Sequence, residues 1–160
     1  MSSNNFFIQR AQIVDAPILA ELIGKLLYDF NSKNGTNFNI DLNLLTSTCS
    51  TLLERGKFGG FIAVDTKTND PVGAITISQS TAIYNGGDYG VITELYVREG
   101  FRSMGLGNNL LKTAKDFAKE QGWKVIEVGA PKKEEWPRTI EFYKKNGFLE
   151  RGPKLRIHLE

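Results

Sequence analysis

The chain has 160 residues, of which 41% are hydrophobic and 24% are charged. This length suits one domain that buries roughly 70% of its unfolded surface in a single core, and the composition excludes a disordered tail, a collagen and a coiled coil. The formal net charge of +2 is too small to indicate nucleic-acid binding by itself. We therefore expect a single domain over residues 1–160.

Charge and the rarer residue types narrow the possible functions further. Residues 1–97 carry 6 basic and 9 acidic side chains, which gives a formal net charge of −3. Residues 98–160 carry 14 basic and 9 acidic side chains, which gives +5. Cys49 is the single cysteine and His158 the single histidine, which excludes an internal disulfide and a metal site built from several of these residues. With no signal-peptide pattern and no long apolar stretch, we expect a cytoplasmic protein with no membrane partner.

The first part of the chain predicts a strand, two helices and two further strands. A short strand is expected over residues 6–10, followed by a helix capped by Asp15, whose apolar face repeats at helical spacing as far as Phe30. Residues 31–39 are polar and predict a loop, and a second helix is expected from about residue 41 to 55. Two glycines at positions 59–60 should end this region, before strands over residues 61–64 and 72–78 that flank a turn.

The second part alternates strands with helices. Residues 91–97 are rich in β-branched and aromatic side chains and predict a central strand, which a helix over 105–121 should connect to a strand over 125–128. Such a crossover is right-handed and places its two strands in parallel. A last helix beginning at Pro137 should end by Gly147, and strands over 148–149 and 155–159, the latter including His158, should close the sheet. The order of elements predicts a mixed α/β (α+β) fold. The apolar face of the helix over 105–121 consists of Leu106, Leu110, Leu111, Ala114, Phe117 and Ala118.

A glycine-containing segment joins the central strand to the next helix. Gly105 and Gly107 stand where a helix begins, so the backbone allows close approach by a ligand while unpaired N–H groups point outward. Together with Arg102, this arrangement suits a phosphate or pyrophosphate. Neither glycine is followed by Lys, which excludes a P-loop, and Leu110 occupies the place of the third glycine of a dinucleotide fingerprint. The alternative is that the two glycines only permit tight packing.

This segment resembles a known family signature. Arg102-Ser103-Met104-Gly105-Leu106-Gly107 resembles the Arg/Gln-x-x-Gly-x-Gly/Ala acyl-CoA signature of the GNAT superfamily of N-acetyltransferases. Glu94-Leu95-Tyr96-Val97 resembles the fourth strand of that superfamily, and residues 139–148 resemble its late helix. The resemblance covers nearly the whole chain and implies a GNAT-type fold, with a mixed central sheet of six to seven strands and about four helices on both faces.

The chain departs from the family pattern at two places. Trp136 and Thr139 stand where the late helix of the family often has Asn and Ala, which puts cofactor contacts from this helix in doubt. Thr93 stands where members that acetylate diamines often have the first of two acidic residues. A catalytic base at position 93 is therefore absent.

The resemblance implies direct transfer of an acetyl group from acetyl-CoA to a primary amine, without a metal. Backbone groups of Leu95, Tyr96 and Val97 would bind the acetyl-pantetheine, and one N–H would polarise the thioester carbonyl. Arg102 would add positive charge beside the CoA pyrophosphate. The pyrophosphate itself would lie on backbone N–H groups of Ser103, Met104, Gly105, Leu106, Gly107 and Asn108.

Two side chains are candidates for the proton transfers. An alkylammonium must lose a proton before it attacks, and Glu94 is the candidate base, with a purely structural carboxylate as the alternative. Period-two alternation predicts Glu94 and Tyr96 on one face of the strand and Thr93, Leu95 and Val97 on the other. Tyr143 matches the tyrosine that protonates the departing CoA thiolate in many relatives; the alternative is a core tyrosine.

The acceptor is the least specified part of the prediction. Aromatic and acidic residues around positions 28–31 and 84–89 suit a small cationic amine, such as a polyamine, an aminoglycoside or an amino-acid-like molecule. A protein or peptide N-acetyltransferase and a non-catalytic acetyl-CoA-binding regulatory module are the alternatives. Nucleic-acid binding has only the basic second part in its favour, so we expect no such partner, and the oligomeric state is open, with a homodimer among the options.

Overall fold

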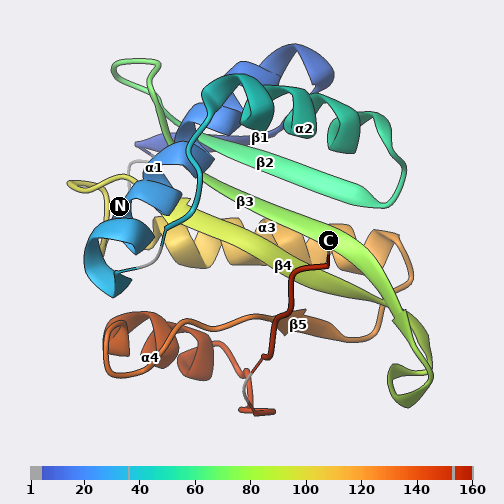
Figure 1. Cartoon of the computed structure of the whole chain (residues 1–160). Helices are drawn as coiled ribbons and strands as arrows, with labels where there is room; N and C mark the ends of the chain where they lie inside the picture. Colours follow the sequence, from blue (N-terminus) through green and yellow to red (C-terminus); the bar gives the residue numbers. More distant parts are fainter. Residues whose placement is uncertain (1–4, 36, 153, 160) are drawn as a thin grey trace.

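The computed structural model describes residues 5–35, 37–152 and 154–159. These residues form one five-stranded sheet in the order β1-β2-β3-β4-β5, in which only the β4–β5 pair is parallel. Helices α1 and α2 cover one face of the sheet and α3 covers the other (Figure 1). The elements are β1 (Phe6–Arg10), α1 (Ala16–Asn34), α2 (Leu42–Glu54), β2 (Phe58–Asp65), β3 (Pro71–Ala82), β4 (Gly87–Val97), α3 (Leu106–Glu120), β5 (Ile126–Val128) and α4 (Pro137–Lys145), with short 3-10 helices at Ile13–Asp15 and Ile83–Asn85.

Local signals explain where the first two helices begin and end. Asp15 stands at the N-cap position of α1, but its side chain accepts the N–H of Gln12 at 2.9 Å and makes no hydrogen bond to α1. The helix runs one turn beyond Phe30 to a left-handed Gly35 with φ of 64°. The predicted loop therefore starts later than residue 31. Asp41 caps α2, because its side chain accepts the N–H groups of Asn43 and Leu44 at 3.0 and 3.2 Å.

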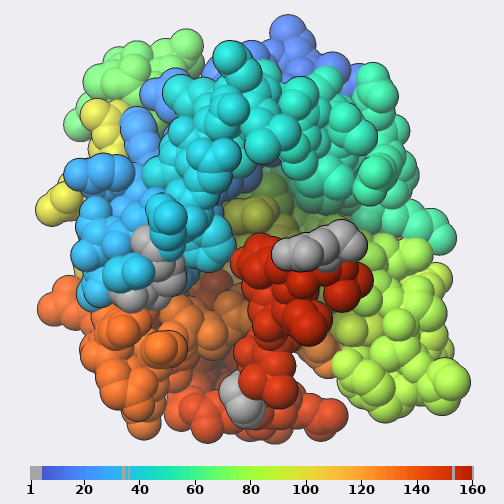
Figure 2. Space-filling view, in the orientation of Figure 1, coloured from blue at the N-terminus to red at the C-terminus, as the bar shows by residue number. Residues whose placement is uncertain are grey.

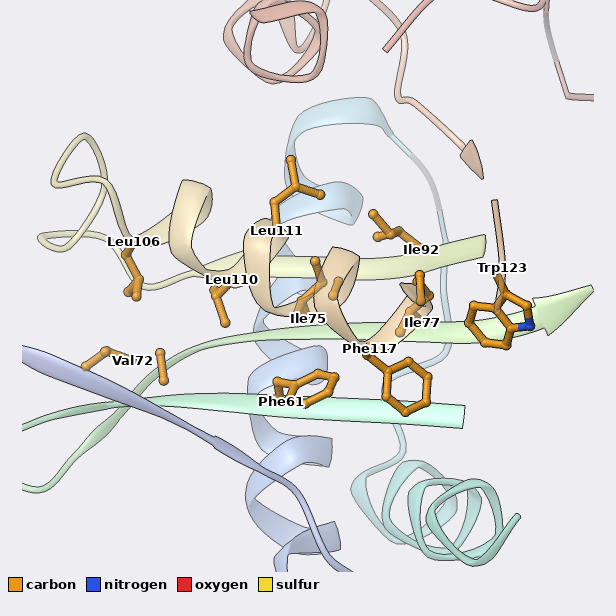
Figure 3. Packing of buried hydrophobic residues seen from close by; sticks show 13 residues of the cluster. Phe61, Val72, Ile75, Ile77, Ile92, Leu106, Leu110, Leu111, Phe117 and Trp123 are labelled. Carbon is orange, nitrogen blue, oxygen red and sulfur yellow. The ribbon is translucent and has the colours of Figure 1, made fainter. Parts of the chain in front are cut away.

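The core has one cluster on each face of the sheet. On the α3 face, all six apolar residues predicted for that helix are buried, and they pack on strand residues such as Ile75 and Ile92 (Figure 3). On the other face, residues of α1 such as Leu19 and Leu22 pack with Ile62, Val64 and Tyr96. Each strand of the sheet centre therefore contributes side chains alternately to the two clusters.

The prediction about the glycines at 59–60 is wrong. Gly59 and Gly60 lie inside β2 and do not end the region before it. A Cβ on Gly59 would meet the ring of Phe117 at 3.2 Å, and one on Gly60 would meet Leu19 at 3.2 Å. Both glycines therefore let helices on opposite faces approach the strand closely.

The closing strands are absent, so the expectation of six to seven strands is wrong for the described residues. The chain turns at Gly147 and Gly152, which have φ of 91° and 104°, and residues 154–159 pair with no strand. Leu155, Ile157 and Leu159 are 81–89% exposed. Their alternation matches a strand, but alternation stabilises a strand only when a neighbour pairs with it, and β5 offers an edge of three residues. None of the described helices is long and apolar enough to cross a bilayer.

Candidate active site

The site is organised by a bulge in β4 and by the separation of β4 from β5. Register along β3 shifts at Thr93, since Thr76 faces Glu94 whereas Ile77 faces Ile92. β5 pairs with β4 only as far as Val128, and Pro131, which has no N–H to donate, follows soon after. A cleft of about 320 Å³ opens where the strands part, lined by Val91, Ile92, Thr93, Gly129, Ala130 and Lys154.

Backbone groups of Leu95 face the opening beyond this point. The N–H of Arg98 donates to the carbonyl of Val72 on β3 at 2.8 Å. In an antiparallel pair alternate residues form these bonds, so Tyr96 also directs its backbone groups toward β3, while Leu95 and Val97 direct theirs to the side from which β5 has separated. The Val97 carbonyl accepts Nε of Arg102 at 2.7 Å. Of the three residues predicted to bind the pantetheine, Leu95 has the best-placed backbone.

Glu94 is held by two threonine hydroxyls at the bulge. The hydroxyl of the buried Thr76 donates to Glu94 Oε1 and accepts the N–H of Glu94 at 3.0 Å. The Thr93 hydroxyl donates to the same Oε1 at 2.8 Å and lies 2.7 Å from the hydroxyl of Thr76. Oε2 has no hydrogen-bond partner among the described residues. One oxygen therefore orients the carboxylate and the other is available to a ligand.

The bulge also explains why simple alternation failed for Thr93. Leu95 and Val97 share one face, as predicted, and pack against the α3 cluster, whereas Tyr96 belongs to the α1 cluster. Thr93 is not on the face of Leu95, because its hydroxyl reaches Glu94 and Thr76. An extra residue in a bulge reverses the alternation that precedes it.

Cys49 lies near the cluster formed by Glu94, Thr76 and Thr93, and this proximity has no signal in the sequence. The thiol lies on α2 and is 7% exposed. Burial, and to a lesser extent the negative charge of Glu94, raise its pKa to about 11. The thiol is therefore neutral at physiological pH, which makes it a poor nucleophile, and the interaction with Glu94 places α2 beside the carboxylate.

A cluster of free backbone N–H groups lies at the other end of β4, where α3 begins. Ser103 and Gly105 have φ of 65° and 82°, and no atom lies within 4 Å of the position that a Cβ on Gly105 would take. None of the N–H groups of residues 103–108 has a hydrogen-bond acceptor in the described parts of the chain. Consecutive N–H groups at a helix N-terminus form a site for an anion such as a phosphate.

Helix α4 packs directly against this N-terminal turn of α3. A Cβ on Gly107 would lie 3.4 Å from the ring of Phe142, and Asn146 Nδ2 donates to Asn108 Oδ1 at 3.1 Å. The two glycines thus differ: Gly105 supplies a left-handed conformation beside open space, whereas a Cβ at Gly107 would make an ordinary van der Waals contact with Phe142.

Tyr143 lies on the same helix and is 6% exposed. Its ring packs between Phe142 and Phe148, with centroid distances of 5.2 and 5.4 Å. Burial raises the pKa of Tyr143 to about 12, so the hydroxyl keeps its proton at physiological pH. The side chain is a hydrogen-bond donor on the helix that packs against the start of α3.

Arg102 is engaged with α1. Its guanidinium donates to Asp29 Oδ2 at 3.2 Å and lies 5.9 Å from the ring centre of Tyr96, in addition to the Val97 contact. Positive charge for a pyrophosphate therefore has to come chiefly from the N–H groups and the dipole of α3. Its proposed contact with the pyrophosphate is a prediction that this geometry does not display.

Trp136 connects α4 with α1 through an aromatic contact. It occupies the N-cap position of α4, and its ring packs on Phe30 of α1 at 4.9 Å, with Lys33 Nζ 4.3 Å above it. Where the family pattern has Asn, this chain thus has an aromatic contact between α1 and α4. The departure at position 136 was visible in the sequence, but its partner, about one hundred residues away, was not. Within the described ranges, no group of three or more His, Cys, Asp or Glu side chains is placed to hold a metal ion.

Solved acetyltransferase structures resemble the chain along almost all of its length. The aminoglycoside acetyltransferase meta-AAC0020 from an uncultured soil metagenomic sample is 25% identical in its complex with trehalose, with a TM-score of 0.75 and 99% of each chain covered. The same protein in complex with sisomicin is 23% identical, with a TM-score of 0.76 and 98% of each chain covered. A predicted acetyltransferase from Clostridium acetobutylicum, solved with acetyl-CoA, is 23% identical, with a TM-score of 0.78 and 96% of each chain covered.

A more distant structure shares the fold alone. The ribosomal-protein-alanine N-acetyltransferase from Brucella melitensis biovar Abortus 2308 is 18% identical, with a TM-score of 0.69, and 96% of this chain and 99% of that one are covered. The profile of the Acetyltransferase (GNAT) family matches residues 27–148 of the chain. This range includes the bulge in β4, the anion site and α4. The chain belongs to the GNAT family and is an acetyltransferase.

Proposed function

We propose that this acetyltransferase moves the acetyl group of acetyl-CoA directly to a primary amine of a small cationic molecule. One observation carries the proposal: β4 holds a carboxylate with a free oxygen at its bulge and leads, a few residues later, to a cluster of free N–H groups at the start of α3. An acyl thioester bound along β4 from that cluster would bring its reactive end toward Glu94.

The CoA moiety is proposed to bind along the C-terminal part of β4. The N–H groups of residues 103–108 would receive the pyrophosphate, and Gly105 leaves space for it. The backbone of Leu95 would pair with the pantetheine in the gap left by β5, with its N–H directed at the thioester carbonyl. A donor in that position stabilises the negative charge that develops on the carbonyl oxygen during attack.

Glu94 and Tyr143 are proposed to move the protons. A primary alkylamine is mostly protonated at neutral pH, and Glu94 Oε2 would accept the proton that the amine must lose. Tyr143, whose proton is firmly held because burial raises its pKa to about 12, would donate a hydrogen bond to the departing thiolate. Because a thiolate is a good leaving group, losing this donor should slow the reaction without abolishing it.

A cationic acceptor is supported by the charge and chemistry around the bulge. The free oxygen of Glu94 would attract an ammonium as well as deprotonate it. The 25% identical meta-AAC0020 is an aminoglycoside acetyltransferase, which makes aminoglycosides a natural class to test first. Polyamines and amino-acid-like amines share the same primary ammonium.

A thiol-release assay with a panel of amines tests the proposal. Glu94→Gln should keep the affinity for acetyl-CoA, measured by calorimetry, and lower kcat about 100-fold, whereas Tyr143→Phe should lower kcat about tenfold. Glu141→Gln, which changes an exposed carboxylate on α4, is the matched control and should behave as the wild type. Wild-type turnover by both E94Q and Y143F would refute the assigned roles, and acetyl-CoA binding without acetylation of any amine would favour a binding module.

A further inference from the structure

The C-terminal segment, residues 154–159, runs over the cleft between β4 and β5. Figure 1 shows it passing in front of β5 toward the middle of the sheet, on the side covered by α1 and α2. In the space-filling view a hollow lies between α2 and this segment, with strands of the sheet at its floor (Figure 2). The segment thus borders the same face as Glu94, whose neighbours Cys49 and Tyr96 belong to the α1 cluster.

Lys154 is the residue of this segment that lines the cleft. Its side chain lies against Gly129, with both Cδ and Nζ 3.9 Å from the position of a Cβ on that glycine. Thr93 lines the same cleft and hydrogen-bonds to Glu94 Oε1 at 2.8 Å. Lys154 therefore lines the same cleft as the threonine that holds the candidate base.

The ammonium of Lys154 also has no counter-ion in the described parts of the chain. No carboxylate oxygen of residues 5–35, 37–152 or 154–159 lies within 4.0 Å of its Nζ, whereas Lys144 on α4 pairs with Glu150 at 3.2 Å. Gly152 before it, with φ of 104°, turns the chain, and the residues after it form neither helix nor strand. Lys154 is thus a primary amine on an extended peptide, placed at the cleft where the acceptor amine is expected.

We infer that Lys154 is an acceptor in cis, so that the protein acetylates its own C-terminal segment. This inference rests on the proposed function, because it uses the same acetyl-CoA site and the same base. The Lys154 ammonium first loses a proton to Glu94. Its nitrogen then forms a bond to the thioester carbonyl carbon, the C–S bond breaks with its electrons on sulfur, and the thiolate takes up a proton as the second proton leaves the nitrogen. The products are Nε-acetyl-Lys154 and CoA.

Tethering favours this reaction over attack by a free lysine. The amine is held at the cleft by its own chain, so the reaction is unimolecular in protein once acetyl-CoA is bound. Acetylation would also remove a positive charge from the acceptor cleft. A cationic acceptor would then meet less repulsion, which links the modification to the acceptor affinity of the same site.

Mass spectrometry of the full chain incubated with acetyl-CoA, without any added amine, tests the inference. We expect the mass of one acetyl group to be added, peptide mapping to locate it at Lys154, and its first-order rate to be independent of protein concentration. Lys154→Arg should abolish the modification, and Glu94→Gln should slow it at least about tenfold. The control Lys67→Arg changes an exposed lysine in the turn between β2 and β3 and should leave it unchanged.

The outcomes separate this inference from the proposed function. Acetylation of panel amines with an unmodified Lys154 would refute the inference and leave the proposed function in place. Modification of Lys154 without turnover of any panel amine would support the inference and refute the small-molecule function. Modification that persists at the wild-type rate in E94Q or in the denatured chain would identify a non-enzymatic reaction and overturn the inference, as would a rate that rises with protein concentration.

Discussion

The Thr76→Val substitution examines how the bulge in β4 holds Glu94. Valine keeps the branched shape of threonine and removes the hydroxyl, which donates to Glu94 Oε1 and accepts the N–H of Glu94 at 3.0 Å. Thr76 is 1% exposed, so water does not replace the lost group. The substitution therefore leaves the carboxylate with one donor fewer, while the Glu94 N–H still faces the backbone of β3.

The substitution is expected to lower both stability and turnover. A lost hydrogen bond to a charged group costs about 1.5–3 kcal/mol. Because the new methyl group is buried and recovers part of this loss, the free energy of unfolding should fall by about 1–2 kcal/mol. Thr93 still holds Glu94 Oε1 at 2.8 Å, so kcat should fall only about tenfold, equivalent to about 1.4 kcal/mol in the activation free energy.

Urea unfolding, amine turnover and acetyl-CoA calorimetry measure these effects separately. Affinity for acetyl-CoA should not change, because the N–H groups of residues 103–108 are untouched. Thr76→Ser should restore kcat, and Thr81→Val, which removes an exposed hydroxyl 2.7 Å from Asp88, should cost less than about 1 kcal/mol. If T76V lost stability but kept the wild-type kcat, the hydroxyl would not serve to position Glu94.

Two further substitutions address the late helix and the anion site. Burial raises the pKa of Tyr143 to about 12 from its usual value near 10, so its contribution to stability is complete below pH about 10 and is lost as the pH rises through about 12. At pH about 11 the free energy of unfolding should have fallen by about 1.4 kcal/mol for this reason. Urea unfolding of Tyr143→Phe should lack this part of the fall, and an equal fall in both proteins would contradict the burial argument. Gly105→Ala, at φ of 82°, should cost about 1 kcal/mol of stability and weaken acetyl-CoA binding about tenfold in calorimetry by turning N–H groups away. Gly100→Ala, at φ of 95°, should cost similar stability without that loss of affinity, and equal losses of affinity in both variants would argue against the anion site.

The elements that the sequence predicted well are those in which one periodic pattern meets one partner surface. Helix α3 is the example: its six apolar residues repeat at helical spacing, all are buried, and a glycine follows its end at Gly122. In residues 155–159 apolar and polar side chains alternate just as regularly, but alternation does not indicate whether a partner strand is available. The residues there stay exposed, and the sheet ends at β5.

The site was predicted less completely than the fold, for two physical reasons. A bulge adds one residue without leaving any compositional mark, so alternation placed Thr93 on the wrong face of β4. Contacts between distant segments have no local signal either. Asp29 and Arg102 are 73 positions apart, and Trp136 meets Phe30 only because the fold brings the start of α4 to α1.

The contact between Arg102 and Asp29 changes where the charge for each substrate resides. Residues 1–97 have a net charge of −3 and residues 98–160 one of +5, yet Asp29 and Arg102, one from each part, pair at 3.2 Å. Because Asp29 is paired with Arg102, Glu94 is the carboxylate that the bulge itself offers to an ammonium. Because Arg102 is engaged with Asp29, the free N–H groups of residues 103–108 would carry most of the attraction for a pyrophosphate. In the proposed function, both substrates would then be recognised chiefly by groups on one continuous segment, from the bulge in β4 to the first turn of α3.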